Sequence, residues 1–126
     1  MDAKLLGVMT LLLAMTVESV AQVSLKIGAS GGPAILVVPF RLWVGKFRLL
    51  SSAAGWTALG VLLYVLEILL YTLVLHWLDV SVAFPMGSLC FVGVTLLSKI
   101  LLGEAVDRVR WLGVLCIIAG TAIMAL

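Results

Sequence analysis

The chain has 126 residues, of which 64% are hydrophobic and 11% are charged, and its mean hydropathy is +1.32. This composition is typical of a protein that crosses a membrane several times, and it excludes a separate soluble domain. The net charge of +2 gives no reason to expect a nucleic-acid partner. One histidine and two cysteines without metal-ligand or catalytic spacing lead us to expect no enzyme activity, cofactor or metal site.

Four apolar runs are each long enough to cross a bilayer, which takes about 20 residues. They occupy residues 5–26, 54–75, 80–102 and 110–126. We therefore predict an all-α membrane protein, a single domain of four transmembrane helices over residues 1–126.

The first run has an alternative interpretation as a cleaved signal peptide. Lys4, the apolar block at residues 5–17 and the small residues that follow have that order. However, Asp2 weakens the positive start, and apolar residues continue to Ile27, beyond the expected cleavage site. We interpret the run as a retained helix.

A polar stripe runs through the first helix. Glu18, Gln22 and Lys26 are spaced by four residues, so a helix places them on one face over roughly 12 Å. An ionisable group deep in hydrocarbon costs at least about 2.5 kcal/mol, and it normally faces a partner or an aqueous cavity. Alternatively, Glu18 lies at shallow depth and Lys26 extends to the head groups. Taken together, the three residues favour a substrate path.

A basic connection at residues 27–53 joins the first two runs. Its segment 40–50 places apolar side chains on one helical face and arginines on another, namely Trp43, Phe47 and Leu50 against Arg41 and Arg48. This pattern predicts a short helix in the membrane interface with its guanidinium groups at phosphate level. A simple topology anchor explains the pattern equally well.

The second run carries an acidic residue, Glu67, with Tyr64 and Tyr71 on the same helical face. We expect the two phenols to hydrogen-bond the carboxyl group and lower the cost of burying it. Both a structural role for Glu67 and a role in transport are consistent with the sequence.

The third run contains Phe84 and Pro85 in its first turns. Proline lacks a backbone donor and disturbs the carbonyl group four residues earlier, so we predict a kink at Ser81. Irregular backbone in a membrane is tolerated where it is buried in protein or lines a cavity. A purely structural kink is the alternative.

The fourth run has Gly113, Cys116 and Gly120 on one face. Small residues allow close helix contact, which predicts an oligomer interface, whereas packing within one chain is the alternative. All eight Lys and Arg residues except Lys4 fall with the first and third connections. The positive-inside rule then places those connections in the cytoplasm and both termini outside.

These features resemble the small multidrug resistance transporters. The likeness rests on Glu18 followed by Lys26, on Leu-Leu-Ser at residues 96–98 with Gly103, and on the spaced glycines of the fourth helix. The resemblance implies that the helix-1 glutamate is a shared proton and cation site and that the fourth helix forms a dimer interface. Met86 stands where those exporters typically carry a tryptophan.

A closer resemblance is to the EamA-like flippase subunits for aminoarabinose-phosphoundecaprenol. It rests on VAFPMGSLCFVGVTL at residues 82–96, LGEA at 102–105 and RWLG at 110–113, and on Gln22 with Lys26. The long basic first connection fits this group as well. Those subunits generally lack an acid at the position of Glu18.

The leading hypothesis is a flippase subunit that moves a polyprenyl-phosphate-linked sugar, such as an amino sugar, across the bacterial inner membrane. Its expected partners are membrane lipids, this glycolipid, and a second copy or an oppositely oriented homologous subunit. A proton-coupled exporter of small organic cations and a non-transporting assembly subunit are the alternatives. The expected substrate contacts are Glu18, Gln22, Lys26, Arg41, Arg48, Tyr64, Glu67, Phe84 and Pro85.

Overall fold

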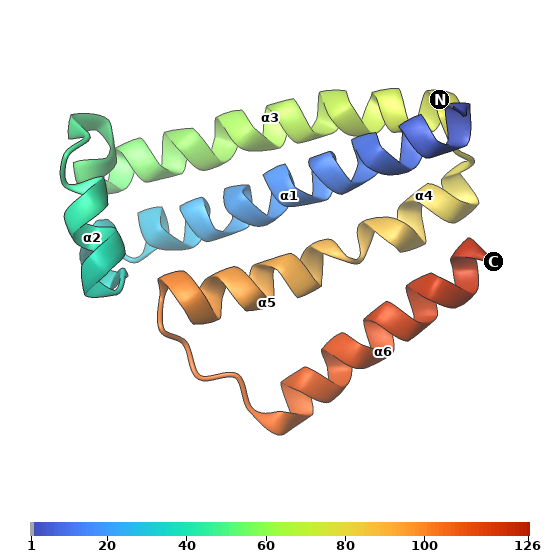
Figure 1. The fold of residues 1–126 in the computed structure, drawn as a ribbon. Coiled ribbons are helices and arrows are strands. Elements are labelled where there is room, and N and C mark those ends of the chain that lie inside the picture. Colours follow the sequence, from blue (N-terminus) through green and yellow to red (C-terminus); the bar gives the residue numbers. More distant parts are fainter. Residues whose placement is uncertain (1) are drawn as a thin grey trace.

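The computed structural model describes residues 2–126, and that part of the chain is built from helices with short connections. Four segments in it are long and apolar enough to span a membrane. They are α1 (Ala3–Ala29), α3 (Ala53–Trp77), the consecutive pair α4 (Val80–Gly87) and α5 (Cys90–Leu101), and α6 (Arg108–Ala125). The predicted all-α fold with four spans is therefore confirmed. In Figure 1 the spans follow one another in the order α3, α1, α4–α5 and α6.

The closest packing is between α1 and α3, and it depends on small residues. A Cβ atom at Gly60 of α3 would lie 2.7 Å from the Leu25 side chain and 3.2 Å from the Ala21 carbonyl oxygen of α1. Gly7 and Gly28 allow equally close approach elsewhere on α1. Because lipid gives no hydrophobic driving force between helices, such close contact is a main source of helix association in a membrane. α1 is the most buried span and stands at the centre of the bundle.

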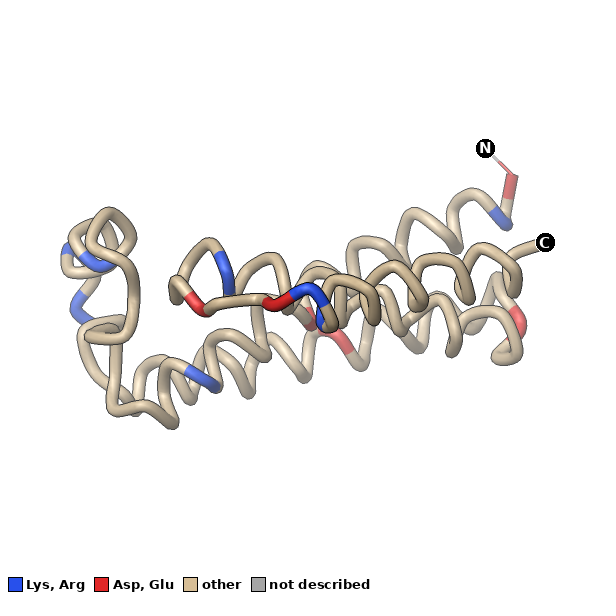
Figure 2. The backbone as a smooth tube through the Cα atoms, turned by 90° about the horizontal axis from the view of Figure 1, so that it is seen from below, with Lys and Arg blue, Asp and Glu red and all other residues tan. Residues whose placement is uncertain are grey.

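The basic connection closes one end of the bundle. It contains the 3-10 helices η1 (Pro33–Ile35) and η2 (Arg48–Ser51) and, between them, α2 (Val38–Val44), which lies across the ends of α1 and α3 (Figure 1). Val44 packs with Ile27 and Trp56 in an apolar cluster at this end. In Figure 2 the basic residues of the connection gather here, at the end of the bundle away from both termini.

The prediction of one continuous helix over residues 40–50 is wrong. α2 ends at Val44, and the chain turns before η2 begins at Arg48. Val44 and Leu50 both pack at the apolar cluster. In one continuous helix these two side chains, six residues apart, would point in directions about 240° apart and could not both face the cluster. The break lets both side chains reach the cluster, while Trp43 and Phe47 remain exposed with their ring centroids 5.2 Å apart.

The third span is broken, but at a later position than predicted. The helix is regular through Pro85 and ends at Gly87, and Ser88 and Leu89 then donate backbone hydrogen bonds to the carbonyl groups three residues earlier. The Ser88 hydroxyl also donates to the Pro85 carbonyl and competes with the helix pattern there. The break therefore lies at Gly87 and Ser88, between α4 and α5, and not at the predicted position around Ser81.

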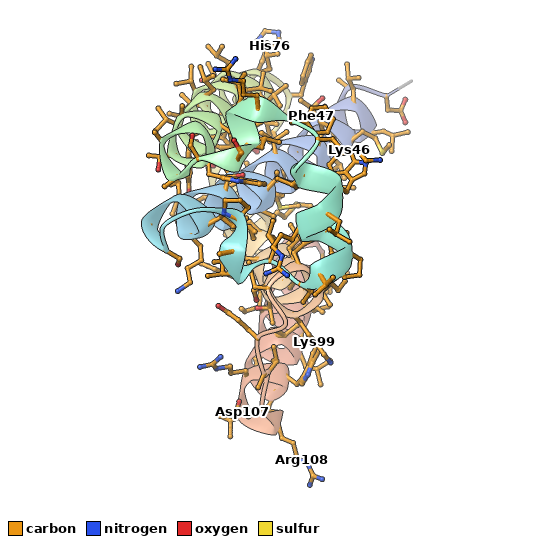
Figure 3. The ribbon with its side chains drawn as sticks, turned by 90° about the vertical axis from the view of Figure 1, so that its left-hand side faces the viewer. Lys46, Phe47, His76, Lys99, Asp107 and Arg108 are labelled. Carbon is orange, nitrogen blue, oxygen red and sulfur yellow. The ribbon has the colours of Figure 1, made fainter. Side chains whose placement is uncertain are left out.

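The last span, α6, diverges from the other helices (Figure 1). A hydrogen bond of 3.3 Å joins the hydroxyl groups of Thr121 and Ser88, and the Lys99 ammonium lies 5.2 Å from the centroid of the Trp111 ring. Figure 3, viewed from the α2 end, shows Arg108 pointing away from the remaining helices. No atom of the described chain lies within 4 Å of where a Cβ atom would stand at Gly113 or Gly120. These glycines therefore do not serve packing of α6 against the other described residues.

Candidate functional site

A cavity of about 300 Å³, here called the acidic cavity, lies between α1, α3 and the break between α4 and α5. Its polar side chains are Glu18, Glu67, Tyr71 and Ser88. The rest of the lining is mainly apolar and consists of Leu11, Ala14, Met15, Phe84, Gly87, Cys90 and Phe91. An apolar cavity with a few convergent polar groups is the usual form of a ligand site.

The acidic cavity brings together two carboxylates that lie far apart in the sequence. Glu18 comes from the middle of α1 and Glu67 from the middle of α3, and both are half-buried. The glycine-mediated packing of α1 against α3 holds them at the same cavity. Two acids at one apolar site, both within membrane-spanning segments, are costly unless a cation, a proton or water compensates them. This arrangement is suited to binding a positively charged group.

The predicted hydrogen bonds from Tyr64 and Tyr71 to Glu67 do not form. The phenol oxygen of Tyr71 is buried and has no hydrogen-bond partner among the described residues. The Tyr71 side chain instead packs beside the apolar cluster around Leu11 and Met15. Tyr64 is not among the residues that line the cavity.

The helix break contributes Phe84 and Ser88 to the acidic cavity, whereas Pro85 is not part of the lining. Sequence reasoning identified Phe84 but missed Ser88, Cys90 and Phe91, which follow the break. Their only signal was their position just after the Pro85 and Gly87 pair.

A second cavity of about 300 Å³, here called the polar cavity, lies closer to the α2 end of the bundle. It is lined by Gln22, Val23 and Lys26 of α1, Val94 and Ser98 of α5, and Leu102 and Glu104 of the following connection. The stripe predicted on α1 therefore faces α5 as one surface, with Glu18 in one cavity and Gln22 and Lys26 in the other. Sequence reasoning missed Ser98 and Glu104, because no spacing linked them to α1.

A close crossing of α1 and α5 lies between the two cavities along α1. The Ser19 hydroxyl is 2.8 Å from the Met15 carbonyl oxygen and 3.2 Å from the Cys90 carbonyl oxygen of α5. A Cβ atom at Gly93 would collide with the Ser19 hydroxyl. The helices can approach this closely only because residue 93 is a glycine.

The two arginines of the basic connection belong to neither cavity. Arg41 lies on α2 and Arg48 begins η2, and both are exposed to the surroundings at the end of the bundle. Lys26 thus lines a cavity and the two arginines do not, although all three are expected substrate contacts.

A model of the EamA-like transporter family matches residues 4–126. The chain belongs to this family. This confirms the resemblance noted from residues 82–96, and it identifies the four spans as those of a multi-pass membrane transporter.

Among similar EamA-like proteins are three described as probable 4-amino-4-deoxy-L-arabinose-phosphoundecaprenol flippase subunit ArnE. The one from Pectobacterium atrosepticum is 44% identical over 56% of this chain and 62% of its own length. The one from Pseudomonas fluorescens is 39% identical over 65% of this chain and 68% of its own. The one from Yersinia pseudotuberculosis is 40% identical over 62% of this chain and 68% of its own length. The chain thus spans about two thirds of the length of these relatives. No solved structure matches the chain.

Proposed function

We propose that this chain is a subunit of a flippase that moves a polyprenyl-phosphate-linked amino sugar across the bacterial inner membrane. The observation that carries the proposal is the meeting of Glu18 and Glu67 in one cavity beside a broken membrane helix. The names of the similar proteins, which are flippase subunits for such a lipid, support it.

The acidic cavity has the chemistry needed for an amino-sugar head group. An ammonium group between Glu18 and Glu67 would offset two carboxylates that are expensive to keep in an apolar region. The rings of Phe84 and Phe91 offer further favourable contact with a cation or a sugar face. The break between α4 and α5 would let the lipid tail stay in the bilayer while the head group occupies the cavity.

The basic end of the molecule would face the cytoplasm. The bias of Lys and Arg toward the connections around α2 and before α6 favours that orientation, with both termini outside. Arg41 and Arg48, exposed near the aromatic pair Trp43 and Phe47, would lie at the membrane surface and attract anionic head groups.

The working unit would contain a second subunit. Four spans leave the acidic cavity incompletely enclosed, and the described residues do not cover the face of α6 with Gly113, Cys116 and Gly120. Such a face would accept a second copy or a homologous subunit of opposite orientation in close contact.

A proton-coupled exporter of small organic cations is the second candidate. Two carboxylates and two phenylalanine rings around 300 Å³ would also accept a small cation. This alternative requires no group that recognises phosphate.

Transport by the full chain in proteoliposomes, alone and with any co-purifying subunit, tests the proposal. We expect flipping of a polyprenyl-phosphate-linked amino sugar, loss of flipping in Glu18→Gln and Glu67→Gln, and normal assembly of both variants. Flipping of the corresponding lipid without an amino group at the same rate would contradict the role of the acids. Export of small aromatic cations without lipid flipping would support the second candidate. No transport at all by an intact complex would leave an assembly role instead.

A further inference from the structure

The polar cavity has a composition different from that of the acidic cavity. Its charged residues are one cation, Lys26, and one acid, Glu104, and they form no ion pair in the part of the chain that the structure describes. Gln22 projects into the cavity beside Lys26, and its amide forms no hydrogen bond with the described residues. An ammonium group and a free amide N–H on one helical face are suitable donors for an anion.

The backbone fixes Glu104 at this cavity. Gly103 has a left-handed φ of 64°, and the turn lets the Glu104 amide donate to the Ser98 carbonyl oxygen at 3.3 Å. The end of α5, just before this turn, is tied to the basic connection, because the Val37 amide donates to the Leu101 carbonyl oxygen at 3.0 Å. Glu104 is therefore a positioned acid that shares a cavity with Lys26.

The position of the polar cavity relates it to the acidic cavity. Both lie along the same face of α1, and Lys26 is eight residues, or roughly 12 Å along the helix, from Glu18. The Ser19–Gly93 crossing lies between them. A head group that carries both a positive and a negative charge would find complementary charges in the two cavities, in the order set by this stripe.

We infer that the polar cavity is a binding site for the phosphate group of the transported lipid, with Lys26 as its counter-charge and Gln22 as its hydrogen-bond donor. The inference rests on the proposed function and adds a separate phosphate site to it. The Ser98 hydroxyl is not a free donor, because it donates to the Thr95 carbonyl oxygen at 3.0 Å. Glu104 balances the charge of Lys26 in the empty cavity and competes with the incoming phosphate.

The opposite charges of Lys26 and Glu104 make the test specific. Binding is measured with the full chain in nanodiscs of phosphatidylcholine, using polyprenyl phosphate, the uncharged polyprenol and inorganic phosphate as probes. We expect polyprenyl phosphate to bind more tightly than polyprenol, and Lys26→Gln to weaken its binding about tenfold or more. Glu104→Gln should tighten it about threefold, because it removes a competing charge at an exposed site, where charge interactions are weak.

Lys46→Gln is the matched control, because Lys46 lies on the basic connection outside both cavities (Figure 3). Equal weakening by Lys46→Gln and Lys26→Gln would overturn the inference, since it would indicate a general surface charge. Weaker binding of polyprenyl phosphate to the Glu104→Gln variant would contradict the inference that Glu104 competes with the phosphate. Inorganic phosphate that binds as tightly as the lipid would show that the site takes free phosphate instead. If polyprenyl phosphate binds in a way that depends on Lys26 but the amino-sugar lipid is not flipped, the phosphate site is retained and the proposed function is rejected.

Discussion

Ser19 and Gly93 are in direct contact where α1 crosses α5, between the acidic and the polar cavity. The contact leaves no room for a side chain at residue 93. This crossing lies beside the polar face of α1. The two cavities share no lining residue.

The first prediction concerns this crossing. Gly93→Ala should destabilise the protein by about 1–3 kcal/mol, because the added methyl group collides with the Ser19 hydroxyl. Ser19→Ala should partly rescue it, and the coupling is measured by thermal unfolding in detergent across the four proteins of the double-mutant cycle. Additive effects of the two changes would mean that the crossing is not as close as described.

The second prediction concerns the unpartnered phenol of Tyr71. Tyr71→Phe should leave the protein equally stable or raise the free energy of unfolding by about 1 kcal/mol, because a buried oxygen without a partner is removed. Transport should fall, because Tyr71 lines the acidic cavity and its hydroxyl has no partner among the described residues. Tyr64→Phe makes the same chemical change outside the cavity and should have the smaller effect on transport. Unchanged transport in Tyr71→Phe would place this oxygen outside the substrate path.

The third prediction concerns the open face of α6. Gly120→Leu should disrupt the complex before it affects membrane insertion, because close helix contact requires a small residue there. Gly120→Ala, which adds one methyl group, should be tolerated much better. Native mass in detergent measures the outcome. A complex of unchanged mass in Gly120→Leu would locate the interface elsewhere.

The fourth prediction concerns orientation. Cysteines introduced at Asp2 and at Lys46, in a variant whose two native cysteines are replaced by alanine, should react from opposite sides of the membrane. Asp2→Cys should react from outside and Lys46→Cys from the cytoplasm, because positively charged connections stay inside. Labelling of both positions from one side would contradict the assigned topology.

The fifth prediction separates the surface arginines from Lys26. Replacement of both Arg41 and Arg48 by glutamine should reduce lipid flipping less than Lys26→Gln does, because Lys26 lines the polar cavity and the arginines line neither cavity. Their contribution should fade as ionic strength rises, as expected for attraction at a membrane surface. An effect larger than that of Lys26→Gln at high salt would give the arginines a specific binding role.

Periodicity and local chemistry determine much of this protein. Long apolar runs specify the four spans, because a helix in lipid must satisfy its own backbone and needs a fixed length of apolar residues. The spacing of Glu18, Gln22 and Lys26 specifies one face of α1, and the structure retains that face. The break in the third span was also predictable, although its position depends on a side-chain hydrogen bond of Ser88.

Only the tertiary structure decided which distant residues meet. Glu67 reaches the cavity of Glu18 because α1 and α3 pack through glycines that had shown no functional pattern in the sequence. Glu104 reaches the cavity that Lys26 lines because Gly103 reverses the chain after α5. The helix expected over residues 40–50 is broken because Val44 is buried in the apolar cluster and Leu50 packs against the same cluster. Local spacing specifies the faces of single helices, whereas contacts between helices depend on how closely their backbones can approach.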